Sequence, residues 1–104
     1  MKAIVIFVTC PNKKEATVIA RSLVKNKLVA CVNIINGIES IFWWENKIDS
    51  AREVLLVIKS NAARLKKIIA HVRSLHSYKV PEIIAWPISG GYKPYLDWIN
   101  ESVR

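Results

Sequence analysis

Three side chains of the sequence belong to the types that bind soft or borderline metal ions. His76 is predicted at the end of a helix, on its apolar side, where a neutral imidazole is a good ligand for copper or zinc. As thiolates, Cys31 and Cys10 would bind Cu(I), Zn(II) or Hg(II). Cys10 also comes just before a predicted helix N-terminus, which would lower its pKa modestly and make it a reactive thiol. The simpler interpretation is structural: a hydrogen-bonded core histidine and small buried hydrophobic cysteines.

Three charged residues offer a second type of site. Glu53 and Lys59 lie an even number of residues apart on one predicted strand, so their side chains point to the same face. Together with Glu82 they would line a polar pocket. A surface salt bridge is an equally good interpretation. His71 falls on the polar face of its predicted helix, and we expect it to be solvated.

Four large apolar residues in succession, Ile41-Phe42-Trp43-Trp44, are the most informative local feature. Side chains alternate along a strand, so the four cannot all face one side. Adjacent tryptophans on a water-facing surface are unusual unless something covers them. We therefore predict a subunit interface or a ligand-pocket wall here, with core packing on both sides as the alternative.

No motif of a known catalytic class is present. The sequence contains no paired-carboxylate motif, no nucleophile elbow, no glycine-rich phosphate loop and no HExxH segment. The two cysteines are 21 residues apart, which matches no zinc or redox spacing. We therefore expect a protein that is not an enzyme.

The elements that position these residues follow from hydrophobic periodicity. The order is strand, helix, strand, strand, helix, strand and a final helix, which predicts an α+β, ferredoxin-like βαββαβ sandwich. Asn12 and Glu15 have capping-box spacing, and Asn36-Gly37 should bend a long hairpin that turns at residues 45–47. The predicted strands are 3–8, 29–35, 40–44, 53–60 and 80–88; the helices begin at Asn12, at Asn61 and near Pro94, with the second ending at His76.

Composition restricts the remaining possibilities. The chain has 104 residues, 52% of them hydrophobic, which predicts one globular domain spanning 1–104. Its net charge of +8 suits nucleic acid, an anionic membrane or an anionic ligand, but no nucleic-acid motif accompanies it. No apolar run is long enough for a signal peptide or a membrane span. We expect a chain that begins at Met1 and stays in the cytoplasm, with no membrane or nucleic-acid partner.

Six phrases of the sequence, taken together, are specific. They are Thr9-Cys-Pro-Asn12, Leu28-Val-Ala-Cys-Val-Asn-Ile34, Ser40-Ile-Phe-Trp-Trp44 with Lys47-Ile48, Glu53-Val-Leu-Leu-Val-Ile-Lys59, His76-Ser-Tyr-Lys-Val-Pro-Glu-Ile-Ile-Ala85 and Tyr95-Leu-Asp-Trp-Ile99. In this order they resemble the CutA divalent-cation tolerance proteins, and the match runs nearly end to end.

The resemblance implies a PII-like homotrimer whose long hairpins pair across subunits, with Phe42, Trp43 and Trp44 at the interface. It also implies tolerance to copper and other divalent cations, with no accepted catalytic reaction and no obligatory cofactor. His76 matches a family histidine. Ser77 replaces the proline that usually follows this histidine in the family. Val8 and Leu75 stand where members with a described copper site have a cysteine and a histidine, so this chain keeps one of that site's ligands.

Three functional hypotheses follow. The first is a trimer that binds a metal ion, such as copper, or a small ligand in clefts between subunits near His76, Trp44, Lys59, Tyr78 and Glu82. The second is a PII-like signalling module for a small anion or nucleotide. The third is an architectural trimer that scaffolds other proteins.

Overall fold

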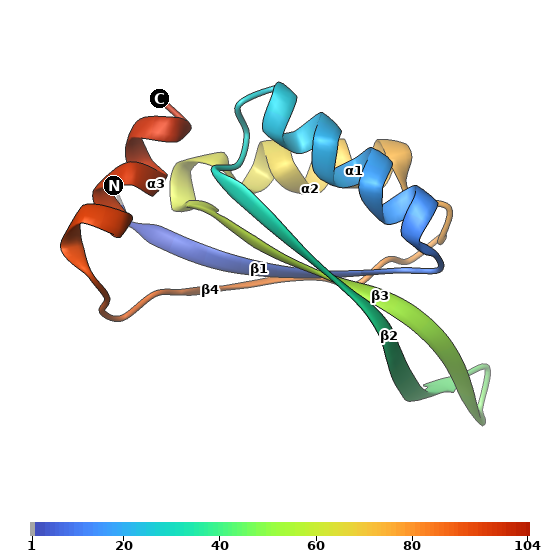
Figure 1. The fold of residues 1–104 in the computed structure, drawn as a ribbon. Helices are drawn as coiled ribbons and strands as arrows, with labels where there is room; N and C mark the ends of the chain where they lie inside the picture. The colour runs from blue at the N-terminus through green and yellow to red at the C-terminus, as the bar shows by residue number, and fades with distance from the viewer. Residues whose placement is uncertain (1) are drawn as a thin grey trace.

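A four-stranded antiparallel sheet with order β2-β3-β1-β4 is the centre of the fold (Figure 1). The computed structural model describes residues 2–104, so Met1, the predicted start of the mature chain, lies outside the described residues. The strands are β1 (Ala3–Cys10), β2 (Cys31–Trp44), β3 (Lys47–Asn61) and β4 (Ile83–Pro87). The helices are α1 (Lys13–Lys25), a 3-10 turn η1 (Ala62–Arg64) that leads into α2 (Leu65–Leu75), and α3 (Lys93–Ser102).

Helices α1 and α2 cover one face of this sheet, which we call the helix face (Figure 1). Side chains alternate along β1, so Ile4, Ile6 and Val8 point into the core while Val5 and Phe7 point to the other side. Apolar side chains of α1 and α2 pack against those of the sheet. The buried core cluster is Ile4, Ile6, Val8, Cys10, Ala16, Ile19, Leu23, Val29, Val54, Leu56, Ile58, Ile68 and Val72.

The opposite side of the sheet, which we call the open face, is apolar and lacks a covering layer of helices. Cross-strand register places Phe7 beside Val57 and Ile84, and Val5 beside Trp86. The Phe7 and Trp86 rings meet edge to face with centroids 4.7 Å apart. In the single chain β1 is therefore buried on one face, since Val5 and Phe7 on the other stay partly exposed.

Strands β2 and β3 form a hairpin that extends beyond the body of the domain, as Figure 1 shows, and we call residues 38–53 the arm. The sequence predicted two separate segments, 29–35 and 40–44, but β2 is one continuous strand. The predicted irregularity at Asn36-Gly37 is confirmed as a shift in pairing between Ile35 and Ile38, with Gly37 at a φ of 73°. β3 is longer than predicted because it pairs with β2 along the whole arm.

Helix α3 lies across the end of the sheet near the start of β1 (Figure 1). Pro94 is in its first turn, as the sequence predicted, because the first helical N–H groups need no intrahelical partner. Its buried residues are Ile99 and, just beyond it, Val103. The Arg64 guanidinium donates to the Val103 carbonyl, which ties the C-terminus of α3 to the start of α2.

Two predicted boundaries are wrong near the candidate site. The last strand was expected over 80–88 but begins at Ile83, because Pro81 has no N–H and the preceding residues bond to the site described below. The second helix was expected to include His76. It ends at Leu75, and His76 is its C-cap in an extended conformation (φ −82°, ψ 136°).

Candidate functional site

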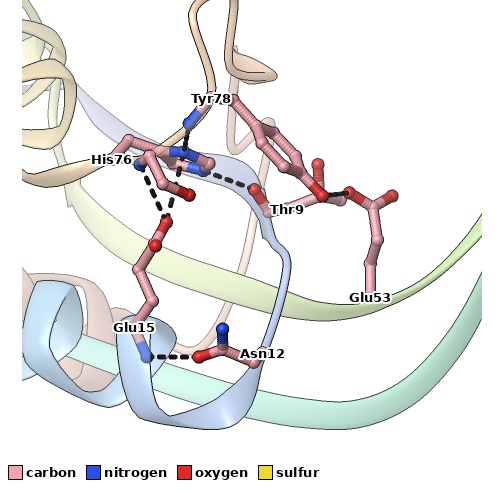
Figure 2. Close-up of polar contacts among 7 residues, drawn as sticks. Thr9, Asn12, Glu15, Glu53, His76 and Tyr78 are labelled. Atoms are coloured by element: carbon pink, nitrogen blue, oxygen red, sulfur yellow. Dashed lines mark hydrogen bonds and ion pairs between the residues drawn. The ribbon is translucent and has the colours of Figure 1, made fainter.

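His76 lies at the junction between the end of α2 and the end of β1, with only 9% of its surface exposed. Its Nε2 is 2.7 Å from the carbonyl oxygen of Thr9, and the Tyr78 backbone N–H donates to its Nδ1 at 3.0 Å (Figure 2). A carbonyl can only accept and an N–H can only donate, so this pattern describes a neutral ring with its proton on Nε2. Both ring nitrogens therefore have protein partners, as in the structural interpretation of this histidine.

Glu15 connects the same histidine to the first helix. Its backbone N–H donates to the Asn12 side chain at 2.8 Å, so the capping-box spacing correctly predicted the N-terminus of α1. Its carboxylate does not bond to the backbone N–H of Asn12, as it would in a complete capping box. Instead Oε2 accepts from the Ser77 N–H at 3.0 Å and lies 3.4 Å from His76 Nδ1 (Figure 2).

Tyr78 extends this network to β3. Its ring centroid is 4.9 Å from that of His76, and its hydroxyl donates to Glu53 Oε2 at 2.8 Å. Glu53 is buried, with 8% of its surface exposed. Burial and the hydrogen bond to Glu53 raise the pKa of the Tyr78 phenol to about 12, so the hydroxyl keeps its proton and continues to donate.

We call Thr9, Asn12, Glu15, Glu53, His76, Ser77 and Tyr78 the His76 network. Sequence reasoning found His76, Tyr78 and Glu53 as site candidates but missed the roles of Thr9, Glu15 and Ser77. The Asn12–Glu15 spacing identified a cap, yet nothing local indicates that the Glu15 carboxylate reaches a loop 62 residues further along the chain.

Cys10 lies beside this network in the core, and the prediction that its pKa would be lowered is wrong. Desolvation by burial, and then the carboxylates of Glu15 and Glu53, raise the pKa of the Cys10 thiol to about 12. The thiol is fully buried and belongs to the core cluster. Removal from water outweighs the helix N-terminus as an influence on its charge.

We therefore expect Cys10 to resist alkylation in the native protein. A pKa of about 12 leaves roughly one thiol in ten thousand ionised at pH 8, and burial blocks the reagent as well. Mass spectrometry after a timed iodoacetamide pulse on a Cys31→Ser variant checks this, with the urea-unfolded variant as the fully reactive control. Comparable rates in the native and unfolded samples would contradict the assignment.

Cys31 lies in a different place, near the start of β2 and paired with Lys59. The Lys59 ammonium is 4.0 Å from the Cys31 sulfur and donates to the Asn33 side chain. Burial, and then the Cys31 thiol, raise the pKa of the neighbouring Tyr95 phenol. His71 is also not simply solvated, since its Nε2 lies 2.7 Å from the Ser22 hydroxyl of α1.

The predicted metal ligands thus fall into two separate groups. Cys10 pairs with Val54 on β3 while Cys31 pairs with Lys59, and five residues of strand correspond to roughly 17 Å. His76 bonds to Thr9 and belongs to the Cys10 end. Among residues 2–104 no group of three or more His, Cys, Asp or Glu side chains is placed to hold a metal ion. One chain alone does not assemble a site from these donors.

The predicted ligand-cleft residues are also dispersed. Tyr78 belongs to the His76 network, Lys59 lies with Cys31, Trp44 is on the arm and Glu82 is exposed. Glu53 and Lys59 are on the same strand as predicted, but each has its own partner and they share no pocket with Glu82. Surface hollows of about 470 and 480 Å³ lie instead between α2 and α3 and between α1 and α2, and none of these residues lines them.

The aromatic residues of the arm are distributed over its two sides. Register pairs Phe42 with Asp49 and Trp44 with Lys47, on the side that continues from Glu53. Trp43 pairs with Ile48 on the reverse side. The exposed fractions are 38% for Phe42, 72% for Trp43 and 51% for Trp44. Both sides of the arm therefore leave large apolar groups in water in the single chain.

Comparisons with known proteins all lead to one family. A family model described as "CutA1 divalent ion tolerance protein" matches residues 4–102. "Protein CutA 1, chloroplastic" from Oryza sativa is 47% identical over 98% of this chain and 58% of its own length. "Divalent-cation tolerance protein CutA" from Archaeoglobus fulgidus is 44% identical over 95% of this chain and 96% of its own.

Solved structures agree with the sequence matches. CutA from Xylella fastidiosa superposes with a TM-score of 0.96 at 38% identity, covering 100% of both chains. A structure titled "Periplasmic divalent cation tolerance protein CutA", from Archaeoglobus fulgidus, has a TM-score of 0.95 at 42% identity, covering 98% of this chain and 99% of that one. The chain spans somewhat more than half the length of the plant relatives it matches. No helix in the described part of the chain is long and apolar enough to cross a membrane.

Proposed function

The chain belongs to the CutA1 divalent ion tolerance family, and from this we propose that it is a non-enzymatic divalent-cation tolerance protein acting as a homotrimer. We further propose that it is one ferredoxin-like, PII-like domain over 1–104. The antiparallel order β2-β3-β1-β4, with a helix after β1 and another after β3, supports this part. A cytoplasmic location stays a prediction, because relatives carry chloroplastic and periplasmic names.

The observation that supports the proposed homotrimer is apolar surface that the single chain leaves uncovered. The open face exposes 51% of Ile84 and 42% of Trp86, and the arm exposes large groups on both its sides. Surfaces of this kind are stable in water when a partner covers them. A second copy of the chain offers the same apolar surface and the same arm, so copies can cover one another in a closed ring.

We propose that the metal ion or small ligand binds between subunits. The donors of one chain do not complete a metal site by themselves, because Cys31 lies far from Cys10 and His76. His76 would become a ligand by exchanging the hydrogen bond from the Tyr78 N–H at Nδ1 for the metal ion. A neighbouring subunit is the nearest source of further ligands, and the exposed Glu82 carboxylate is free to meet them. Copper or another divalent cation would suit imidazole and thiol donors of this kind.

Metal titration of the reduced protein tests this proposal. We expect Cu(I) or Cu(II), measured under chelator competition, to bind wild type at least ten times more tightly than His76→Ala. His71→Ala is the matched control and should bind like wild type, since the ring of that histidine bonds to Ser22 and lies outside the His76 network. A Glu82→Gln variant tests whether the Glu82 carboxylate belongs to the same metal site. Because this side chain is exposed, the change does not disturb the core.

Two outcomes would contradict the proposal. Equally weak binding by wild type and His76→Ala would remove His76 as a ligand. Wild-type affinity in a variant held as a monomer would place the ion within one chain. A nucleotide or small anion that raises the melting temperature when metals do not would favour the PII-like signalling hypothesis instead.

A further inference from the structure

The surplus positive charge of the chain is confined to one layer of the fold. Residues 13–27 and 62–75, which contain α1, η1 and α2, hold nine of the sixteen basic residues and a single acidic residue, Glu15. The rest of the chain has seven basic and seven acidic residues and is neutral. The nine basic residues are Lys13, Lys14, Arg21, Lys25, Lys27, Arg64, Lys66, Lys67 and Arg73.

These basic side chains face outward and lack acidic partners. Helices α1 and α2 lie side by side over the sheet (Figure 1), and all nine residues except Arg64 are exposed. Glu15 is turned inward, where its carboxylate accepts from Ser77 and lies beside His76. Within residues 2–104 the ion pair formed by a lysine or arginine side chain is Lys93–Asp97, so none involves these nine. The outer surface of α1 and α2, which we call the basic face, is thus an uncompensated positive field.

The side chains between the charges indicate what kind of polyanion fits. The exposed large apolar residues of this layer are Val18, Val24 and Leu75. It has no exposed aromatic residue, because the exposed tryptophans and tyrosines belong to the arm, β4, α3 and the turn before α3. Without aromatic rings the face cannot stack on single-stranded bases, and three aliphatic side chains give it little of the apolar surface by which membrane-surface helices insert. Backbone phosphates of a duplex require neither property.

We propose that the basic face binds the phosphate backbone of double-stranded nucleic acid without regard to sequence. Helix α1, with 13 residues, is roughly 20 Å long, comparable to the spacing of several successive phosphates. The sequence has no nucleic-acid motif and therefore predicted no such partner, but backbone binding needs only positive charge concentrated on one face. This inference depends on neither the proposed metal site nor the proposed homotrimer.

Fluorescence anisotropy with a labelled 20-base-pair duplex of arbitrary sequence tests the proposal. We expect binding by wild type at 50 mM NaCl that weakens steeply with salt, with a log–log slope of about −4 for four or five neutralised phosphates. Arg21→Glu/Lys66→Glu reverses two charges on the basic face. Lys79→Glu/Lys93→Glu is the matched control, because it changes net charge equally at exposed positions outside that face.

The basic-face variant should lose at least tenfold in affinity at 50 mM NaCl, and the control should lose less than threefold. Equal losses would show an effect of net charge alone and would overturn the proposal. No detectable duplex binding by wild type at 50 mM NaCl would overturn it too. Tighter binding to vesicles containing phosphatidylserine than to the duplex would also overturn it, in favour of an anionic membrane.

Discussion

If the chain forms the proposed homotrimer, replacing Trp44 with arginine is expected to convert it into smaller species. In the single chain 51% of Trp44 is exposed, so a covering subunit would remove on the order of 100 Å² of indole surface from water. At about 25 cal/mol per Å² this contributes roughly 2.5 kcal/mol per subunit, which the symmetry of the proposed trimer would repeat at each copy. The Trp44→Arg variant lacks this hydrophobic contribution. It also places a positive charge in the contact between subunits, and burying a charge without a partner is costly.

Light scattering coupled to size exclusion measures this outcome directly. Glu45→Gln is the matched control, because it makes the same change in net charge at an exposed position of the hairpin tip. We expect the control to keep the wild-type mass and Trp44→Arg to elute at a lower mass or melt at a much lower temperature. A fully trimeric Trp44→Arg protein with an unchanged melting temperature would show that Trp44 is not part of the interface.

Replacing His76 with alanine is expected to lower the free energy of unfolding by about 2–4 kcal/mol. The change removes a buried ring and leaves the Thr9 carbonyl and the Tyr78 N–H without their partners. It also removes the contact with Glu15 that helps to connect α1 to the end of α2. A buried polar group without a partner costs more than the net contribution of a typical hydrogen bond, so the loss should exceed that of a surface histidine.

His71 provides the internal comparison. It is only half-buried and bonds to Ser22, so His71→Ala should cost no more than about 1 kcal/mol. Urea denaturation at one fixed protein concentration compares the two variants, because oligomer stability depends on concentration. Equal losses of unfolding free energy in the two variants would mean that the His76 network does not stabilise the fold. That result would favour ligand binding as the role of His76.

Much of the secondary structure is determined by local sequence. The Asn12–Glu15 spacing predicted the start of α1, and hydrophobic periodicity predicted a second helix where η1 and α2 lie. Gly37 marked the irregularity in β2, because a positive φ there favours a residue without a Cβ atom. These features depend on neighbours within a few positions of the chain, which a single sequence displays directly.

The site depended on tertiary structure, because its contacts join residues that are distant in the chain. His76 meets Thr9 across 67 positions and Glu15 meets Ser77 across 62, and no periodicity encodes either contact. Burial, which follows only from packing, raised the pKa of Cys10 where its position before a helix suggested the opposite. Strand register separated Cys31 from Cys10, and the helix layer gathered the net charge on one face. The sequence by itself thus determined the element order, the aromatic arm and the donor types, whereas folding decided which of those donors meet.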